Sequence, residues 1–306
     1  MIEVNNLSKH YRKSTAVKDI SFSVDSGKVT GFLGPNGAGK STTMRLMLGL
    51  DKGGGTTKYD GRPLKEYPVP SKIVGILLEA KSFHPTRTAR NHLRVLATAG
   101  SVPLARVDEV LDIVGLSQVA KKEPGKFSLG MSQRLGVAAA ILAKPKYLIL
   151  DEPANGLDPE GIVWLREFLK SYTEDGNAVF VSSHLLSEMS QMAENVIVIG
   201  KGELIASTSI QDLISKNTKS SVFVRATNLN KLKTILAGKS FNSIQKNGGL
   251  EITGAKTDDV GRLAHSGDIE ILELTSQNAS LEDVFLDLTE NKEEFQAQSP
   301  KKKVAR

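Results

Sequence analysis

Along most of this chain, short continuous runs of hydrophobic residues alternate with longer segments in which apolar positions recur every three or four residues. The runs are rich in β-branched residues and predict buried strands at residues 28–34, 146–153, 177–183 and 195–207. The longer segments predict helices at residues 40–50, 160–172 and 185–194. Strands that alternate with helices predict an α/β fold with a parallel sheet covered on both faces.

One stretch departs from this alternation. From Pro85 to Pro124 helical periodicity replaces the strands, most clearly at residues 89–100 and 106–116. We therefore predict a helical subdomain, about residues 85–140, that is inserted into the α/β domain.

The pattern changes again after the α/β domain, which we predict to span residues 1–215. Short strand candidates and a closing helix follow, at residues 221–226, 250–254, 269–275 and 281–290. They predict a small α+β domain over residues 216–290. The remaining residues, 291–306, are polar and basic, and we expect them to be disordered. Their basic end, SPKKKVAR, could alternatively contact anionic lipid or nucleic acid.

The composition narrows the class of protein. A chain of 306 residues is long enough for one large and one small domain, and 40% hydrophobic with 24% charged residues is ordinary for a soluble protein. Cysteine is absent, which excludes disulfides and thiolate metal sites. No apolar run approaches the about 18 residues that span a bilayer, and the N-terminus lacks the apolar core of a secretory signal, so we expect any membrane spans to come from another chain. Aromatic residues make up only 5%, so no nucleic acid partner is expected despite a net charge of +6.

The first candidate site is the stretch GPNGAGKST, which lies between a predicted strand and a predicted helix. It matches the phosphate-loop pattern G-x-x-x-x-G-K-[ST]. The glycines allow the backbone to point successive N–H groups at phosphate oxygens, and Lys40 can reach the β- and γ-phosphates. The Ser41 hydroxyl can ligate Mg²⁺, with Thr42 beside it. The residues predicted to bind nucleotide here are Gly34, Pro35, Asn36, Gly37, Ala38, Gly39, Lys40, Ser41 and Thr42.

Two adjacent carboxylates, Asp151 and Glu152, stand at the end of the apolar run YLIL. Ligands bind at the carboxyl ends of strands in open α/β sheets. We predict that Asp151 holds Mg²⁺ and that Glu152 polarises the water that attacks the γ-phosphate. On its own, LDEP could be an ordinary strand end with a proline turn. Together with the phosphate loop it indicates a nucleoside triphosphate hydrolase.

Three further residues stand where a helix begins or a strand ends. Asp158, which is followed by Pro159, could cap the next helix. His184 follows the strand predicted at residues 177–183 and can reach the γ-phosphate region, although a lone histidine is more often structural. Ser128, in FSLGMSQRLG, could cap a helix and bind a second phosphate there.

In this order the motifs resemble those of the ATP-binding cassette (ABC) ATPase family, from Tyr11 to about Ile205. GPNGAGKST resembles the Walker A motif, YLILDEP the Walker B motif, and FSLGMSQR the family signature. ANGLD resembles the D-loop, and His184 resembles the switch histidine, to which we assign a catalytic role beside Glu152. The resemblance implies a P-loop NTPase fold, with ATP and Mg²⁺ as cofactors.

The family resemblance also implies partners. Two ABC cassettes sandwich two ATP molecules head to tail, and each site joins the Walker motifs of one chain to the signature of the other. Ser128 and Gly130 would therefore contact the γ-phosphate bound by a second cassette, in a homodimer or a heterodimer. Tyr11 resembles the aromatic residue that stacks on adenine, and Asp158 belongs to the D-loop at the nucleotide. Transmembrane permease subunits would hold the chain at the cytoplasmic face of the membrane, as a peripheral protein.

Several local features are similar to exporter subunits of the bacitracin-resistance and lantibiotic-immunity type. These features are SLGM in the signature, ILLEAKSFHP, GLDPEGIVWLR and SLEDVFLDLT. The similarity implies export of an antimicrobial peptide, a drug or a lipid-linked compound. Two motifs depart from the general family pattern. Glu79 stands where the Q-loop has glutamine, and its carboxylate could bind Mg²⁺ or the attacking water. In the signature, Leu129 and Met131 replace glycine and glutamine.

Other members of the family are alternatives. An importer subunit would also be a single cassette, but Glu79 and SLEDVFLDLT favour export. A soluble ABC ATPase that acts on the ribosome usually carries two cassettes, whereas this chain has one Walker A motif. A chromosome or DNA-repair ATPase needs a long coiled coil before the signature, and the segment from Lys40 to Ser128 is too short to contain one.

Overall fold

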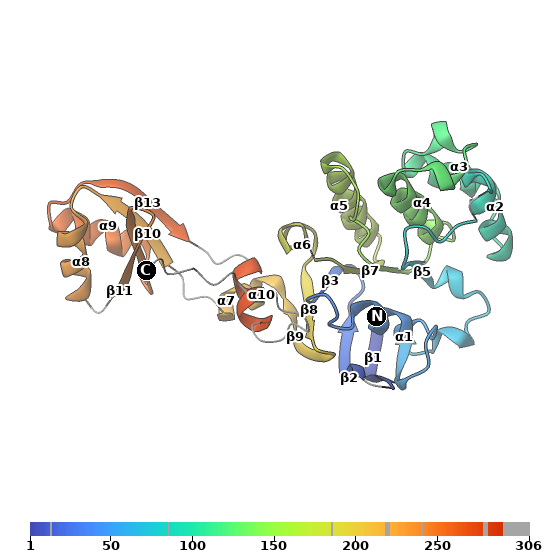
Figure 1. Ribbon diagram of the computed structural model, residues 1–306, viewed down its shortest axis with the longest axis horizontal. Helices are drawn as coiled ribbons and strands as arrows, with labels where there is room; N and C mark the ends of the chain where they lie inside the picture. Colours follow the sequence, from blue (N-terminus) through green and yellow to red (C-terminus); the bar gives the residue numbers. More distant parts are fainter. Residues whose placement is uncertain are drawn as a thin grey trace, which may run out of the picture. The chain divides into compact units, whose positions relative to one another are not determined.

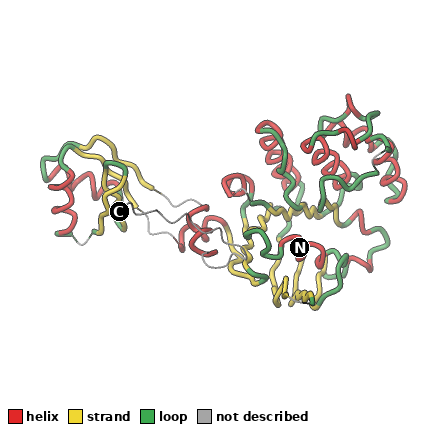
Figure 2. The backbone as a smooth tube through the Cα atoms, in the orientation of Figure 1, coloured by secondary structure: helices red, strands yellow, loops and turns green. Residues whose placement is uncertain are grey.

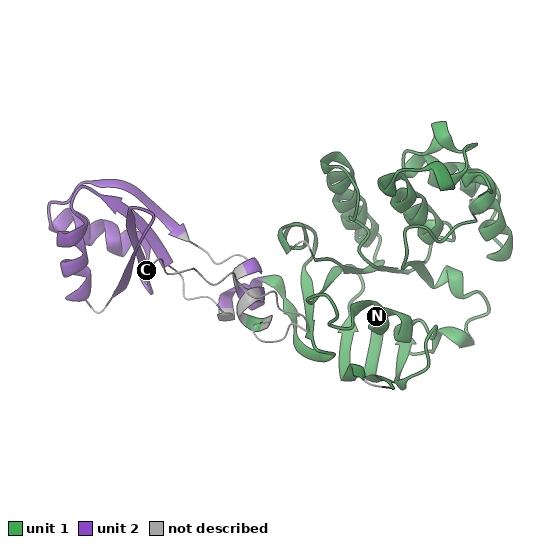
Figure 3. Cartoon of the chain, in the orientation of Figure 1, with its two compact units in different colours: residues 1–210, 288–306 green, residues 211–287 purple. Residues whose placement is uncertain are grey.

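The computed structural model describes residues 1–12, 14–84, 86–184, 186–217, 221–239, 241–277 and 281–289. The chain divides into two compact units, of which the first holds residues 1–210 and 288–306 and the second residues 211–287 (Figure 3). The division falls within helix α7 (Ile210–Asn217), close to the boundary that we predicted after residue 215. The tail that we expected to be disordered, residues 291–306, lies outside the described residues.

A six-stranded sheet runs through the middle of the first unit (Figure 1). Its strands, in spatial order, are β5 (Val74–Leu77), β6 (Tyr147–Leu150), β7 (Ala178–Ser182), β3 (Val29–Leu33), β8 (Asn195–Gly200) and β9 (Glu203–Ser209). All neighbours are parallel except β8 and β9, so the predicted parallel sheet is confirmed. Every residue of β3, β6 and β7 is buried, which explains their continuous apolar runs. The run at residues 195–207 forms two antiparallel strands, because the chain turns at Lys201 and Gly202, both at positive φ.

A second, antiparallel sheet lies against one face of the first and was not predicted. It has the order β2-β1-β4, made by β1 (Ile2–Tyr11), β2 (Ser14–Val24) and β4 (Gly54–Tyr59). Helix α1 (Lys40–Met47) lies with this sheet below the six-stranded sheet in Figure 1. The rings of Phe22, Phe32 and Phe180 meet between the two sheets, with centroids 4.9 to 6.0 Å apart. The buried aromatic cluster joins the two sheets into one core.

Helices cover the opposite face of the six-stranded sheet (Figure 2). They are α5 (Pro159–Glu174) and α6 (Leu186–Met192), with the helical subdomain of α2 (Ala89–Ala99), α3 (Arg106–Ile113) and α4 (Leu129–Ile141) at the β5 edge. The insertion between β5 and β6 is therefore helical, as its periodicity predicted. Among the described helices, none is both long and apolar enough to cross a bilayer.

The second unit has an α+β fold, as predicted. Four antiparallel strands have the order β11-β12-β10-β13, with bounds Asn242–Lys246, Gly249–Thr253, Ser221–Ala226 and Ile271–Gln277. Helices α8 (Leu229–Ala237) and α9 (Thr257–Ser266) pack against this sheet, and Val222, Leu232, Ile252 and Val260 belong to the shared core. The chain of described residues closes with helix α10 (Leu281–Thr289).

Candidate nucleotide-binding site

The phosphate loop, Gly34–Thr42, connects β3 to the first turn of α1. Gly39 is the N-cap of α1 at φ 104°, and a Cβ added there would lie 2.4 Å from the Ala16 carbonyl oxygen, so only glycine fits. Lys40 is only 8% exposed, and its Nζ donates to the carbonyl oxygens of Gly34 at 2.6 Å and Pro35 at 3.4 Å. Burial lowers the pKa of Lys40, and the nearby carboxylates of Glu152 and Asp151 only partly offset this effect. The loop thus folds around its own lysine, in a shape that suits a phosphate group.

The two acidic residues of the second motif lie at the carboxyl end of β6. Strand β7 separates β6 from β3, so these carboxylates, the end of β7 and the phosphate loop share one edge of the sheet. The Ser182 hydroxyl, at the end of β7, donates to Asp151 Oδ1 at 2.5 Å and accepts from the Glu152 N–H at 2.9 Å. Ser182 is fully buried, and it holds both acidic residues in place. Sequence reasoning missed Ser182, although it directly precedes the Ser183–His184 pair.

Glu152 has an unusual backbone and a paired carboxylate. Its φ is 49°, in the left-handed region that non-glycine residues rarely adopt. The Nδ1 atom of His184 lies 2.7 Å from Glu152 Oε2, and the His184 N–H donates to the same oxygen at 3.3 Å. The structure therefore brings Glu152 and His184 together, and both are accessible to solvent at the sheet edge.

The aromatic residue Tyr11 ends β1 and is 49% exposed, with Lys9 Nζ 5.0 Å from its ring centroid. A cavity of about 410 Å³ lies beside the phosphate loop, close to the β1–β2 hairpin. Ser14, Thr15, Ala16, Lys18, Gly37, Ala38 and Lys201 line it. The cavity therefore lies between the phosphate loop and the start of β2, the strand that pairs with Tyr11. A base and sugar could lie on this side of the loop.

The second phosphate-like stretch begins helix α4 of the helical subdomain. Ser128 is the N-cap of α4, and its Oγ accepts from the Met131 N–H at 3.2 Å, as predicted. Asp158 caps α5 in the same way, accepting from the Gly161 N–H at 2.9 Å. Arg134 connects these two helices, since its guanidinium lies 3.8 Å from Asp158 Oδ1 and 5.2 Å from the Trp164 ring centroid. The signature and the D-loop therefore form one contiguous surface.

Leu129, one of the departures from the family signature, contacts the D-loop directly. Gly156 has a φ of 75°, and a Cβ added there would meet the Leu129 side chain at 2.4 Å. The neighbouring Gly130 also lies close to the D-loop, since a Cβ added to Gly130 would lie 2.8 Å from the Gly156 carbonyl oxygen. Leu129 thus fills space above the D-loop, while 46% of its surface stays exposed.

Few protein ligands are available for Mg²⁺. Among the described residues, no group of three or more His, Cys, Asp or Glu side chains could hold a metal ion. A Mg²⁺ ion usually takes only one or two protein ligands and completes its shell with phosphate oxygens and water. Ser41 at the start of α1 and Asp151 at the end of β6 fit that use. Glu79 is exposed beyond β5, where it lines a different cavity.

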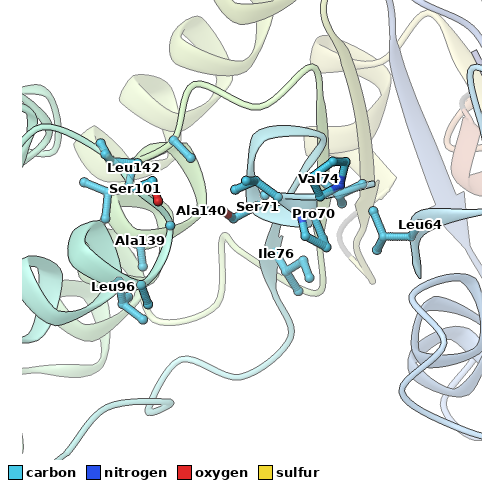
Figure 4. Close-up of a pocket in the computed structure, with 17 residues that line it drawn as sticks. Leu64, Pro70, Ser71, Val74, Ile76, Leu96, Ser101, Ala139, Ala140 and Leu142 are labelled. Atoms are coloured by element: carbon cyan, nitrogen blue, oxygen red, sulfur yellow. The ribbon is translucent and has the colours of Figure 1, made fainter. Parts of the chain in front are cut away.

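An apolar groove runs between β5 and the helices of the subdomain. One cavity, of about 580 Å³, is lined by Leu64, Pro70, Ser71, Val74, Ile76, Leu96, Ser101, Ala139, Ala140 and Leu142, among others (Figure 4). A second, of about 360 Å³, shares Ile76, Leu96 and Ala139 with the first and extends to Glu79. The groove therefore connects the edge strand of the sheet to the loop that carries Glu79.

Comparison with known proteins identifies the family of this chain. A family model described as ABC transporter matches residues 17–155, and a model described as a domain of unknown function matches residues 220–282. YhcH, an ABC transporter ATP-binding protein of Bacillus subtilis, is 40% identical over 304 residues, which cover 97% of this chain and 98% of that protein. The bacitracin transport ATP-binding protein BcrA of Enterococcus faecalis is 42% identical over 228 residues, which cover 73% of this chain and 74% of that protein.

The fold is also similar to that of a known ABC transporter subunit. A solved structure of an ATP-binding subunit of an ABC transporter aligns with a TM-score of 0.65 and 28% identity, over 71% of this chain and 92% of that chain. The family similarity thus extends over nearly the whole chain, and the motifs that carry the chemistry lie at one edge of a shared sheet. This chain belongs to the ATP-binding proteins of ABC transporters, and it is an ATPase.

Proposed function

We propose that this chain hydrolyses ATP with Mg²⁺ at the phosphate loop and thereby powers an ABC exporter. The observation that carries the proposal is the meeting of three strand ends: the phosphate loop after β3, Glu152 after β6 and His184 after β7. The contact of 2.7 Å between His184 and Glu152 supports a joint role at the γ-phosphate.

Each residue has a distinct role in this proposal. Lys40 exchanges its hydrogen bonds to the Gly34 and Pro35 carbonyls for bonds to the β- and γ-phosphate oxygens. Ser41 and Asp151 would hold Mg²⁺, which supplies charge neutralisation between the β- and γ-phosphates. Glu152 orients the attacking water and accepts its proton as the new P–O bond forms and the bond to ADP breaks. His184 donates a hydrogen bond at the γ-phosphate, and Tyr11 stacks on the adenine.

The other half of each site comes from a second cassette. Ser128 and Gly130 lie on an exposed helix start, and Asp158 lies next to it at the start of α5. Helix N-termini and hydroxyl groups bind phosphate oxygens well. We infer that ATP closes a head-to-tail dimer, in which Ser128 and Gly130 contact the γ-phosphate held by the partner's Walker motifs. Hydrolysis removes that bridge and releases the dimer.

Transmembrane permease subunits complete the transporter. The apolar groove along β5 offers a docking surface for a cytoplasmic segment of such a subunit, with Ile76 and Leu96 both exposed in it. The name of BcrA, bacitracin transport, supports export of an antimicrobial compound from the cytoplasmic face of the membrane. Import is the alternative. Purification from membranes that yields a permease without a substrate-binding protein would support export, and recovery of such a binding protein would support import.

The test of the catalytic assignment is Glu152→Gln, which keeps the size of the side chain and removes the base. We expect ATP binding to be retained, with turnover lowered by about 100-fold or more. The matched control is Glu174→Gln, which changes an exposed carboxylate at the end of α5 and should leave turnover unchanged. Near-wild-type ATPase activity in the Glu152→Gln variant would refute the role of Glu152.

A further inference from the structure

The peptide groups on both sides of Glu152 are held by side chains from two other elements. Ser182 accepts from the Glu152 N–H at 2.9 Å, and Gln133 Nε2 donates to the Glu152 carbonyl oxygen at 3.1 Å. Between these two bonds, the backbone of Glu152 has a φ of 49°. A non-glycine residue keeps such a conformation only where its surroundings hold it. The direction of the Glu152 carboxylate therefore depends on both anchors.

Gln133 is an unusual residue for its surroundings. It is 4% exposed on helix α4, and its other polar atom, Oε1, is buried with no hydrogen-bond partner among the described residues. A buried polar atom without a partner costs free energy, and an apolar side chain of similar size would fill the same space without that cost. Packing thus does not explain a glutamine at this position, whereas the bond from Nε2 to Glu152 does.

Helix α4 joins this anchor to the signature. Ser128 caps the helix, and Gln133 lies little more than one turn further along it. The start of the helix is also packed on the D-loop, through Leu129 against Gly156. One rigid element therefore carries both the residue that faces a partner's nucleotide and the residue that holds this chain's own Glu152.

We propose that Gln133 is a positioning residue for hydrolysis: it sets the direction of the Glu152 carboxylate and ties it to the helix that carries Ser128. The inference rests on the proposed role of Glu152 as the base. Engagement of Ser128 by nucleotide in one site of the dimer is then transmitted along α4 to the base of the other site. The link lies entirely within one chain.

The test uses Gln133→Met in the full-length chain, because methionine has a similar shape and lacks both polar atoms. We expect kcat for Mg-ATP to fall about tenfold while KM changes less than twofold, since a small misplacement of a catalytic group mainly affects the chemical step. Melting temperature and ATP-dependent dimerisation, measured by light scattering, should be unchanged. The control is Thr57→Val, which removes a buried hydroxyl on strand β4 that also has no partner among the described residues, and it should leave kcat unchanged.

A double-mutant cycle separates positioning from a general structural effect. In single-turnover assays, adding Gln133→Met to Glu152→Gln should lower the rate no further, because the residue acts through Glu152. An equal tenfold loss in both backgrounds, an unchanged kcat in a folded variant, or a loss of dimerisation that parallels the loss of turnover would overturn the proposal. If Gln133→Met does not fold, Gln133→Glu serves instead, since it keeps the shape and replaces the donor with an acceptor. An active Glu152→Gln variant would refute the base itself, whereas an inactive one with fully active Gln133→Met would refute only Gln133.

Discussion

The two helix starts that we propose to bind phosphate differ in how much of a binding site this chain itself supplies. At the phosphate loop, Lys40 is buried and bonded, and Glu152, His184 and Ser182 form a connected set beside it. At the signature, Ser128 and Leu129 are exposed, and contacts from the D-loop support only the back of the helix start. In the proposed function, the first end supplies most of a nucleotide site, and the second supplies one side of a nucleotide site in a partner.

Under the proposed function, this difference accounts for two phosphate-binding helix starts in one chain. Neither is redundant if each completes a different nucleotide site, one within the chain and one in a partner. The departure at Leu129 also has a physical consequence, because its side chain packs on the D-loop glycine Gly156.

The largest effect is expected at the phosphate loop. Lys40→Met removes the charged group and keeps the length of the side chain, so charge-assisted hydrogen bonds to two phosphates are lost. We expect a cost of about 3 kcal/mol, or roughly 100-fold in the Kd for ATP of the isolated chain. Fluorescence titration with a labelled ATP measures it. An unchanged Kd would show that Lys40 does not contact the phosphates.

At the signature, by contrast, we expect a substitution to leave the Kd for ATP of the single chain unchanged. Ser128→Asp keeps the N-cap of α4, because aspartate caps helices as well as serine does, but places a negative charge against the partner's γ-phosphate. We expect ATP binding by the single chain to be unchanged and turnover to fall about tenfold or more, by like-charge repulsion at the closed site. Ser128→Thr, which keeps the hydroxyl, is the control. Weakened ATP binding in the monomeric Ser128→Asp chain would contradict the separation of the two ends.

A smaller effect is expected at the contact between the signature and the D-loop. Leu129→Ala removes the side chain that covers Gly156, and 46% of that side chain is exposed, so the loss of stability should be about 1 kcal/mol rather than the larger cost of a core leucine. Turnover should fall by less than roughly tenfold, since the D-loop keeps its other contacts. Thermal melting and steady-state ATPase assays test both parts. A variant that melts and turns over as the wild type does would show that this packing has no role.

The smallest effect is expected at Asp60, which belongs to neither helix start, and it concerns stability rather than turnover. Burial alone would raise the pKa of Asp60, but hydrogen bonds from Lys146, Tyr147 and the N-terminal amino group outweigh it and lower the pKa to about 2. The charged form is therefore favoured in the folded state, and its contribution is present above about pH 4 and disappears as the pH falls towards 2. Because 41% of the Asp60 side chain is exposed, we expect about 1 kcal/mol or less.

Asp60→Asn measures this contribution. The melting temperature of the variant should lie a few degrees below that of the wild type at pH 6, and the two should converge near pH 2. ATP turnover at pH 7 should be unchanged. A gap that stays constant down to pH 2 would rule out the carboxylate as its source.

Much of the cassette could be predicted from sequence because its central strands are buried on both faces. Such strands read as continuous apolar runs, and the helices between them have their own period. The antiparallel sheet escaped prediction, since β1 and β2 are half exposed and β4 pairs with β1 across about fifty intervening residues. In the second unit, the edge strand β11 was also missed, because nearly all of its residues are exposed. Helix α9 was missed although its apolar residues recur with clear helical spacing.

The residues of the candidate site also divide into those that the sequence predicts and those that only the fold reveals. The phosphate loop, Asp151, Glu152 and His184 were found because fixed local spacing encodes them. Ser182 and Gln133 were not found, because their contacts with Glu152 depend on how β7 and α4 pack beside the end of β6. Only the fold brings those residues to the base.

The claim that each nucleotide site is shared between two chains is tested most directly by mixing two variants of low activity. Lys40→Met lacks a working phosphate loop and keeps the signature, whereas Ser128→Asp lacks the signature and keeps the phosphate loop. A head-to-tail dimer of one chain of each kind contains one intact site, so the mixture should regain ATPase activity, up to about a quarter of wild type after random exchange of subunits. A mixture no more active than the sum of its two components would contradict the shared site.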